Sequence, residues 1–541
     1  MPDHDTTTGE PALARRGIGG MRGDRIGWLA IFGTSLGLFL VRFLVPTPVG
    51  QADNRDGPRL MCGRGLGVGP VLPRGDPRFF RFAYFQYGPS ASCGHRLPYP
   101  TSQIVPLELA RLLTPVLGLR GTLNLVALGV LMCVLTAAAI ASLAVGLRVA
   151  WWARLAIAAA VWLIMADAAF FDLFASPFEE PAVLVGLLLV ASGVVYLGRG
   201  SRGTLAGLAL AGTGGFLVIL AKEQYLVLAI PICLTLVLTS AAADPAGRAG
   251  LRRYLTGQTA AAAAVAAVLA LLAGGYAVWD ARSTYGKRLH HVQAVDMIFD
   301  DIVNGHDNAR ADLRALGLPV SWRKYAGHYY WDRGSVRNNP LYPRFEAKLT
   351  DGNIAHFLLT HPGRIPGIGQ QAARYAQQFQ VTALGDYPPD AGHPPGAVES
   401  RVVVVTWLMH RLPPGLGLYW LLPLWVVMAA IAVVALRRRR RGRGLPWHRD
   451  GAAAVLCLTG CAVAGFIPPA YFEGISTTRH MVGMNLATAL AFVLAAALAA
   501  SMISQALRRG RPPGGPGDPP TIDGTPVTSV VTPSRPRRSY S

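Results

Sequence analysis

Charged residues are scarce in this sequence of 541 residues. Only 15% of them are Asp, Glu, Lys or Arg, whereas a soluble chain usually carries about 25%; 52% are apolar, and the mean hydropathy is +0.34. These values argue against a purely soluble enzyme, a disordered protein, a coiled coil and a small disulfide scaffold. Although the length allows roughly three or four soluble domains, the repeated apolar runs predict one polytopic membrane domain.

Acidic residues and lysines are also few. The chain has 30 acidic against 51 basic residues, a formal charge of +21, and only four of the basic residues are Lys. Such a balance often indicates nucleic-acid binding, but here the arginines cluster beside apolar runs, where a membrane protein keeps its cytoplasmic positive charge. We therefore expect membrane lipids as partners and no nucleic acid. The Arg bias, with 40 Pro and 61 Gly, indicates a GC-rich bacterial genome.

Cysteines number only six. Four lie in apolar runs, and we interpret them as small packing residues: Cys133, Cys233, Cys457 and Cys461. Cys62 and Cys93 share one polar loop. If this loop faces an oxidising compartment, a disulfide between them is plausible, but the sequence leaves the pairing open.

Common cofactor motifs are missing. The sequence has no GxxxxGK[ST], no GxGxxG placed after a strand, no GxSxG and no HExxH. No motif therefore supports binding of ATP, NAD or zinc, or the nucleophile elbow of an α/β-hydrolase. The adjacent His290 and His291, followed by Asp300 and Asp301, do not have metal-ligand spacing. We predict no dedicated metal site and no certain cofactor, with a divalent cation left open.

Ten apolar runs are long enough to cross a bilayer, which needs about 20 apolar residues in a helix. The predicted fold is therefore an all-α polytopic membrane protein with about ten transmembrane helices. The first run is long and the cleavage consensus near Val49–Ala52 is poor, so we expect a retained helix rather than a signal peptide. The runs cover about 26–46, 122–146, 151–170, 181–198, 204–221, 225–240, 258–278, 417–436, 452–470 and 481–503.

Arginines mark one side of these spans. They precede the first span and follow the tenth. They also lie between the second and third, the fourth and fifth, the sixth and seventh, and the eighth and ninth spans. All of them therefore fall on one side if ten spans alternate. By the positive-inside rule that side is the cytoplasm. We therefore predict a bacterial plasma-membrane protein with both termini in the cytoplasm and its larger polar loops outside.

The segment between the seventh and eighth spans is long enough for a domain of its own. Thr350 and Asp351 are expected to cap a helix that Pro362 ends, and 370–379 is expected to form another helix. We divide the chain into five parts. Residues 1–24 and 504–541 are predicted to be disordered tails. Residues 25–278 hold helices one to seven, with a catalytic outer loop at 47–121; residues 279–416 form a mainly helical extracytoplasmic domain; and residues 417–503 hold helices eight to ten.

Two carboxylates in the first outer loop are the leading catalytic candidates. Asp53 and Asp56 stand three residues apart in Ala-Asp-Asn-Arg-Asp, directly after the first span. Such a pair can supply a base and an orienting or metal-binding partner. On spacing alone a solvated turn is the commoner interpretation, because Asp, Asn and Gly favour turns.

Three further segments carry charges at the outer ends of spans: 172–181, 222–225 and 473–480. Basic groups there can contact an anionic phosphate, while a helix start at Pro181, a snorkelling Lys222 and an interfacial anchor at 473–480 are the structural alternatives. The substrate-binding candidates are Asp172, Glu179, Glu180, Lys222, Gln224, Glu473, Arg479 and His480.

Together these segments resemble the GT-C superfamily of polytopic membrane glycosyltransferases. The stretches ADNRDGPRLMCGRG at 52–65 and STTRHMVGMNLATAL at 476–490 are similar to actinobacterial WsfD-type glycan-biosynthesis hexosyltransferases. DLFASPFEEPA at 172–182 and ALGLP at 315–319 fit the same pattern, and the resemblance covers most of 26–503.

The resemblance implies a mechanism. In that superfamily an acidic motif in the first outer loop carries the catalytic carboxylate, which maps to Asp53, with Asp56 next in line; Arg55 stands where a smaller residue such as Gly is expected. The implied donor is a polyprenyl-phosphate sugar, because nucleotide sugars are not available outside the cytoplasmic membrane. The implied acceptor is a cell-envelope glycan or glycolipid, and transfer on the outer face would invert the anomeric carbon.

The resemblance also assigns the other charges. Lys222, Arg479 and His480 would stabilise the departing lipid phosphate, and Glu179 or Asp172 would bind the sugar or hold a divalent ion with Asp53. The main alternative is a multispan transporter or flippase of a lipid-linked or anionic solute. A further alternative is a membrane scaffold that uses 279–416 to bind a partner.

Overall fold

The structure confirms an all-α polytopic membrane fold. The chain divides into two compact units, Met1–Leu498 and Ala499–Ser541; the first holds the helices and loops that form the candidate site, and the second holds the last turns of helix α20. The computed structural model describes residues 16–54, 56–68, 80–90, 99–197, 199–242, 257–304, 308–413, 415–474 and 477–509.

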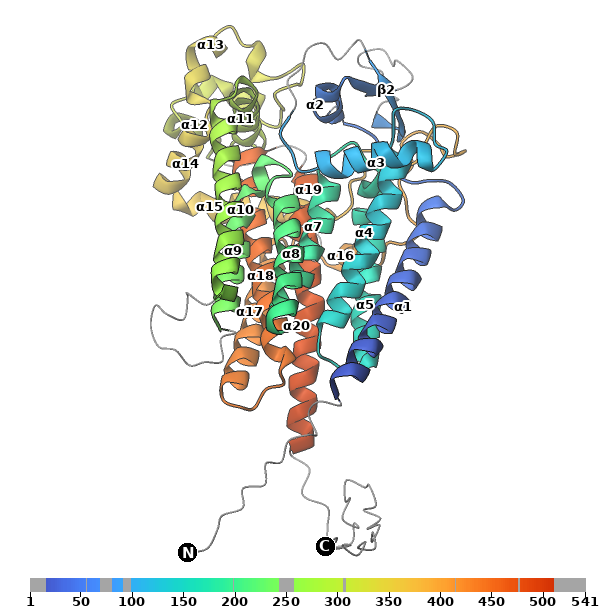
Figure 1. Ribbon diagram of the computed structural model, residues 1–541. Coiled ribbons are helices and arrows are strands. Elements are labelled where there is room, and N and C mark those ends of the chain that lie inside the picture. Colours follow the sequence, from blue (N-terminus) through green and yellow to red (C-terminus); the bar gives the residue numbers. More distant parts are fainter. Residues whose placement is uncertain are drawn as a thin grey trace, which may run out of the picture. The chain divides into compact units, whose positions relative to one another are not determined.

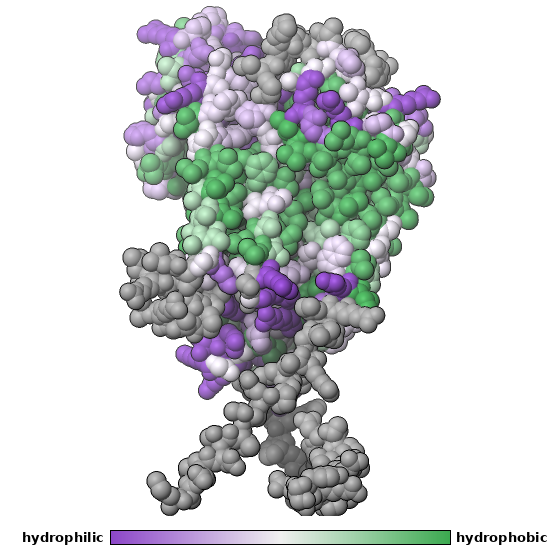
Figure 2. All heavy atoms as spheres, viewed as in Figure 1, coloured by the Kyte–Doolittle hydropathy of each residue, from purple (hydrophilic) through white to green (hydrophobic). Residues whose placement is uncertain are grey.

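Eight helices in the described residues are long and apolar enough to cross a bilayer. In the first unit they run alongside one another (Figure 1), and Figure 2 shows a hydrophobic band across the face in view, with hydrophilic surface above and below it. They are α1 (Arg16–Leu44), α4 (Leu125–Gly146), α8 (Gly200–Ile219), Glu223–Ser240 formed by η5 (Glu223–Leu228) and α9 (Ala229–Ala242), α10 (Gly257–Arg282), α17 (Leu418–Arg440), α18 (Trp447–Pro468) with η12 (Pro469–Glu473), and α20 (Val482–Arg509).

Two of the ten predicted spans differ from a simple crossing helix. The run at 151–170 is a pair, α5 (Trp151–Ala166) and Ala168–Ala175 (α6, Ala168–Phe171, with η4, Asp172–Ala175), bent by 65°. Asp167 causes the break, because its Oδ1 accepts the Ala169 N–H (3.2 Å) and its Oδ2 accepts the Val405 N–H (2.7 Å). The run at 181–198 forms α7 (Glu180–Val194), whose 15 residues rise only about 22 Å, less than the hydrocarbon core of about 30 Å.

Helix α7 is short because it lies inside the bundle and is buried along almost its whole length. It packs closely on α8 through glycines. A Cβ at Gly193 would lie 2.6 Å from the Gly207 oxygen, and one at Gly186 would lie 2.8 Å from the Gly214 oxygen. Small residues at such crossings let helix backbones approach in a membrane, and α7 begins at Glu180, directly after Glu179, at the loop end described below.

The two ends of the bundle differ in chemistry. Arginines gather at one end, which we call the arginine end, where Arg199 donates to the Val145 oxygen (3.1 Å) and lies beside Arg148. The opposite end, the loop end, carries the described parts of the segments 45–124 and 283–416. Helix α1 begins at Arg16, inside the segment 1–24 expected to be a tail, and α20 continues to Arg509, past the expected boundary at 503; residues 1–15 and 510–541 lie outside the described part.

The first loop of the loop end contains the only described strands. β1 (Leu66–Val68), β2 (Gln86–Pro89) and β3 (Leu123–Asn124) form an antiparallel sheet in this order. Helix α3 (Ile104–Val116) lies across the ends of the long helices (Figure 1). It exposes Val105, Leu109, Leu112 and Val116, and these apolar side chains on one face make it an amphipathic helix.

The long loop segment forms a helical layer around its own apolar core. The predicted helix capped by Thr350 is confirmed as α14, and its Thr350 side chain accepts the Asn353 N–H (3.2 Å). Trp322, Phe299 and Phe357 are fully buried in this core. The elements are α11 (Thr284–Asp296), η7 (Met297–Ile302), α12 (Ala309–Ala315), η8 (Val320–Tyr325), η9 (Val336–Asn338), α13 (Tyr342–Phe345), η10 (Glu346–Lys348), α14 (Asp351–Thr360), η11 (Pro362–Arg364), α15 (Ile365–Gln378) and α16 (Val404–Arg411).

Candidate functional site

The first-loop carboxylates lie in a tight turn before α2 (Gly57–Met61). Asp53 is 6% exposed, and its Oδ1 accepts the Gly57 N–H at 2.9 Å. The Asp56 N–H donates to Asn54 Oδ1 at 3.1 Å. Both carboxylates are therefore held by the backbone of one short turn, as expected for Asp and Asn in a turn, and the turn sits at the loop end where α19 (Thr477–His480) also begins.

Gly57 allows the close packing of this turn. A Cβ at Gly57 would lie 2.2 Å from Asp53 Oδ2 and 2.9 Å from the Pro177 Cβ. We expect Gly57→Ala to displace the Asp53 carboxylate and to lower the activity of the site without any change in charge. Gly88→Ala is the matched control, since a Cβ there meets nothing within 4 Å. Equal activity of the two variants at matched protein level, in an assay of the function proposed below, would contradict this role of Gly57.

Arg479 connects the turn that carries Asp53 and Asp56 to the segment 473–480, the last of the charged segments predicted from the sequence. It forms an ion pair with Asp56, donates to Asn54 Oδ1 (3.3 Å), and its Nε lies 3.7 Å from Glu180 Oε1. Its guanidinium is 3% exposed and stacks 4.5 Å above the centre of the Phe178 ring. Burial alone would raise the pKa of Asp56, but the charges of Arg479, Arg59 and Lys222 lower it far below the usual range, so Asp56 stays ionised.

A second arginine, Arg59, holds Glu179. Its Nε and Nη2 lie 3.0 Å and 2.9 Å from Glu179 Oε1, and its Nη1 donates to the Tyr285 hydroxyl at 3.0 Å. The guanidinium also lies 4.9 Å from the centre of the Tyr99 ring. Tyr99 in turn donates to Glu223 Oε2 at 2.8 Å. This chain of contacts ties the first loop to α10, α11 and the hairpin at Lys222.

The hairpin lysine contacts the histidine of the last outer segment. Lys222 Nζ lies 2.8 Å from His480 Nε2, and His480 Nδ1 is in hydrogen-bonding contact with the Glu473 carboxylate. Gln224 Nε2 donates to the His480 carbonyl at 3.0 Å. An ammonium can only donate, so Nε2 accepts, and the imidazole proton lies on Nδ1 toward Glu473. Burial and the charge of Lys222 lower the pKa of His480, which favours this neutral form.

The structure therefore brings most of the predicted site residues together at the loop end. The contact network, named here the loop-end network, consists of Asn54, Asp56, Arg59, Tyr99, Glu179, Glu180, Lys222, Glu223, Gln224, Glu473, Arg479 and His480, with Asp53 in the adjoining turn. Its members come from four segments that are far apart in the sequence.

Asp172 does not belong to this network. It lies 3.9 Å from Arg42 Nη2, and Arg42 Nη1 lies 3.3 Å from Glu399 Oε2. The fully buried Asp386 is the other carboxyl of this group, and its Oδ2 accepts the Glu399 N–H at 2.7 Å. Asp172 and Glu179, both predicted to bind substrate, therefore lie in different contact groups, because η4 turns Asp172 toward Arg42 of α1 while Glu179 faces Arg59.

Asp386 lies in the segment 385–387, which hydrogen-bonds to the first loop and which we call the strap. The Gly50 N–H donates to the Asp386 carbonyl (3.0 Å), the Ala52 N–H to the Gly385 carbonyl (2.8 Å), and the Ala83 N–H to the Tyr387 carbonyl (2.9 Å). These bonds fix the backbone just before Asp53. Arg42 and Glu399 anchor the strap to α1, so this buried charge group positions the turn.

The strap gives the fold a pH dependence. Burial raises the pKa of Asp386 to about 8, from a usual value of 3.8. Between these values the folded state keeps a proton that the unfolded state releases, so stability falls as the pH rises and the loss is complete above about pH 8. Asp386→Asn should make the thermal unfolding midpoint less dependent on pH between pH 5.5 and 9. The exposed control Asp390→Asn should show the same pH dependence as the wild type. Parallel curves for Asp386→Asn and wild type would contradict this assignment.

Several contacts of the network were not predicted. Arg59 and Asn54 lie within the quoted stretch 52–65, and the position of Arg59 three residues after Asp56 was a signal that could have marked it. Tyr99, Asp386 and Glu399 follow no local pattern, because their partners are more than a hundred residues away or lie across the strap. The position Arg55, where the family pattern expects a smaller residue, lies outside the described residues.

The cysteines agree with their locations in the sequence. Cys133, Cys233, Cys457 and Cys461 are free thiols, and all but Cys233 are buried. Cys62 is disulfide-bonded, whereas Cys93 lies outside the described residues. The bonded cysteine starts η1 (Cys62–Arg64), directly after α2, and so stabilises the loop that carries the two aspartates.

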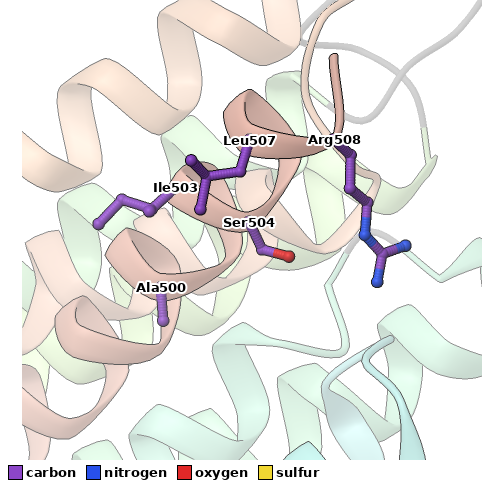
Figure 3. A pocket seen from close by; sticks show the side chains of 5 residues that line it. All are labelled: Ala500, Ile503, Ser504, Leu507 and Arg508. Atoms are coloured by element: carbon purple, nitrogen blue, oxygen red, sulfur yellow. The ribbon is translucent and has the colours of Figure 1, made fainter. Parts of the chain in front are cut away.

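Metal ligands do not gather in the described part of the chain, where no group of three or more His, Cys, Asp or Glu side chains is placed to hold an ion. A separate hollow lies beside the last turns of α20 (Figure 3) and is lined by Ala500, Ile503, Ser504, Leu507 and Arg508. Its lining includes no carboxylate and a single cation, so it lacks the acid–base groups of the loop-end network.

The helices and the loop-end network define a polytopic all-α membrane protein with a cluster of buried, paired charges at the loop end of the bundle. The chain belongs to the YfdI N-terminal transmembrane domain family, whose model matches residues 24–505. This family is associated with glycosyltransferase-like membrane proteins. Neither the curated proteins nor the solved structures contain a match to the chain.

Proposed function

We propose that this protein is an integral membrane glycosyltransferase. It moves a sugar, a hexose in our proposal, from a polyprenyl-phosphate donor to a cell-envelope glycan or glycolipid on the outer face of the plasma membrane. The observation that carries the proposal is the loop-end network, in which four distant segments bring a carboxylate turn next to Lys222, Arg479 and His480. The family's association with glycosyltransferase-like membrane proteins supports the same class.

The charge distribution supports the choice of donor. We assign the arginine end to the cytoplasm by the positive-inside rule, which puts both termini there and the loop-end network outside, where nucleotide sugars are not available. A lipid-phosphate sugar reaches such a site within the bilayer. Its phosphate is an anion, and Lys222 and Arg479, which are 2% and 3% exposed, are cations at the ends of membrane helices.

The chemistry requires one base and one stabilised leaving group. In the proposed step Asp53 takes the proton of the acceptor hydroxyl while that oxygen attacks the anomeric carbon. The bond from this carbon to the phosphate oxygen breaks, the configuration inverts, and the lipid phosphate leaves with the electron pair. Fixed cations then stabilise its growing charge, which is the role proposed for Lys222 and Arg479, with His480 holding Lys222.

Asp56 is a poor general base on electrostatic grounds. The ion pair with Arg479 lowers the pKa of Asp56 far below the usual range, and a general base works best with a pKa near the working pH. We therefore assign Asp56 to orienting Arg479. Glu179, Glu180, Gln224 and Glu473 orient the cations or contact the sugar in this proposal, and Asp172 acts through the strap.

The class of donor is tested with labelled substrates. Membranes that contain the protein and membranes that lack it are given either labelled polyprenyl-phosphate hexoses or labelled nucleotide hexoses, together with envelope glycan. The proposal expects transfer only from the lipid-linked donors and only when the protein is present. Transfer from a nucleotide sugar directly would overturn the donor assignment, and labelled lipid crossing the bilayer without transfer would favour a flippase.

A further inference from the structure

The long loop segment exposes more cations than carboxylates. Asp296, Asp300, Asp301 and Asp312 are at most 6% exposed, while Glu346 and Asp390 are exposed and Asp332 is partly exposed. Exposed cations of the same segment include Lys287, Arg288, Arg310, Arg314, Arg323, Lys324, Arg333, Arg344 and Lys348. The segment thus presents positive charge outward, beyond the ends of the long helices, where Figure 2 shows hydrophilic surface rather than the hydrophobic band.

One part of this surface combines cations with a half-exposed tryptophan. Trp331 is 54% exposed and packs edge-on against Tyr330, with ring centres 4.8 Å apart. The Arg337 guanidinium lies 5.0 Å from the Trp331 ring centre and 5.2 Å from that of Tyr330, and the Arg288 guanidinium lies 5.8 Å from Trp331. We call Arg288, Tyr330, Trp331 and Arg337 the Trp331 platform.

The charge of the platform is not compensated by its neighbours. In the part of the chain that the structure describes, no carboxylate forms an ion pair with Arg288 or Arg337. The nearby Asp332 instead accepts the Tyr329 N–H at 2.8 Å and lies 3.7 Å from His328 Nδ1. Two guanidinium groups are therefore held against one aromatic surface without an internal anion.

Stacking orients a guanidinium while leaving its N–H edge available for donation. Contact with an aromatic face fixes the plane of the group, and the planar fork then matches the two oxygens of a carboxylate or phosphate. We propose that the Trp331 platform binds an anionic glycan, a saccharide chain that carries carboxylate or phosphate groups. The assignment of this glycan as the acceptor rests on the proposed function; the binding itself does not.

A glycan suits the platform better than a lipid surface. Arg288 lies on α11, which continues beyond α10, and Figure 1 shows α11 to α13 beyond the ends of the long helices. Anionic lipid headgroups would lie at the edge of the hydrophobic band. A soluble, extended polyanion can reach the platform from the opposite side, and the two positive charges of the platform would attract such a chain.

The test measures binding of a hexasaccharide of uronic acids to the full-length protein in phosphatidylcholine nanodiscs. The double variant Arg288→Gln and Arg337→Gln is expected to bind at least about tenfold more weakly, because two charge-assisted contacts are lost. The control double variant Arg310→Gln and Arg314→Gln removes the same charge from exposed positions of α12 and is expected to bind within about twofold of wild type. A neutral hexasaccharide of glucose is expected to show no dependence on the platform.

A third variant distinguishes loss of the stacking surface from loss of folding and from a purely electrostatic effect. Trp331→Leu keeps both charges but removes the stacking surface, and we expect it to weaken binding while the unfolding midpoint stays near that of wild type. Equal losses in both arginine pairs, unchanged binding in Trp331→Leu, no binding by wild type, or a platform effect seen only with anionic vesicles would each overturn the inference. Asp53→Asn is expected to bind the hexasaccharide normally, so failure of binding and failure of transfer are separate results.

Discussion

Replacing Asp53 with Asn is expected to lower sugar transfer by about 10²–10⁴-fold, the usual contribution of a general base. Asn keeps the size of the side chain, and its oxygen can still accept the Gly57 N–H that Asp53 accepts at 2.9 Å. Its amide, however, cannot take a proton from an acceptor hydroxyl. The measurement is the initial rate of transfer from a labelled polyprenyl-phosphate hexose, in membranes matched for the amount of protein.

Two comparisons make this result specific. Asp390→Asn changes an exposed carboxylate next to the strap and is expected to transfer at the wild-type rate. Asp56→Asn is expected to act through Arg479, and so to lower the unfolding midpoint together with the rate. An Asp53→Asn protein that inserts normally and transfers sugar at the full rate would exclude Asp53 as the base.

Replacing Arg479 with Gln is expected to have the largest effect on stability. The guanidinium forms the ion pair with Asp56 and lies 3.7 Å from the fully buried Glu180. Removing one partner of a buried pair leaves an uncompensated charge, which costs about 3–5 kcal/mol. We expect a much lower unfolding midpoint in detergent and no detectable transfer, because the variant also loses a cation that stabilises the leaving phosphate.

A conservative variant separates the two roles of this arginine. Arg479→Lys retains the charge but not the planar fork, so it cannot contact Asp56, Asn54 and Glu180 together. It should recover part of the stability and little of the transfer. Arg440→Gln, an exposed change at the arginine end, serves as the control for loss of one positive charge. A wild-type unfolding midpoint for Arg479→Gln would show that the buried pair does not stabilise the fold.

The helical part of this fold follows from local pattern. Long apolar runs leave the chain no alternative to a helix in a bilayer, since every backbone polar group must be satisfied within the segment. The bend at Asp167 and the short α7 were less accessible. The first depends on hydrogen bonds to Val405 and Thr406, more than two hundred residues away, and the second on glycines that pair α7 with α8.

The candidate site shows the same division. Lys222, Arg479 and His480 stood out because charges at span ends are few, and they do meet in one network with Asp56. Asp172, which was also predicted to bind substrate, lies outside this network, because η4 directs it to Arg42. The partner of Glu179 could not be predicted from local pattern, since Arg59 lies 120 residues earlier.

The most direct test of the account uses purified protein in vesicles that contain a labelled polyprenyl-phosphate hexose and an envelope glycan on one side. Sugar bound to the glycan and labelled lipid that has crossed the bilayer are counted in the same sample, for wild type and for Asp53→Asn. The account predicts sugar on the glycan with wild type, almost none with Asp53→Asn, and no difference in lipid crossing. Lipid crossing that depends on the protein, with no sugar transferred, would contradict it and identify a flippase.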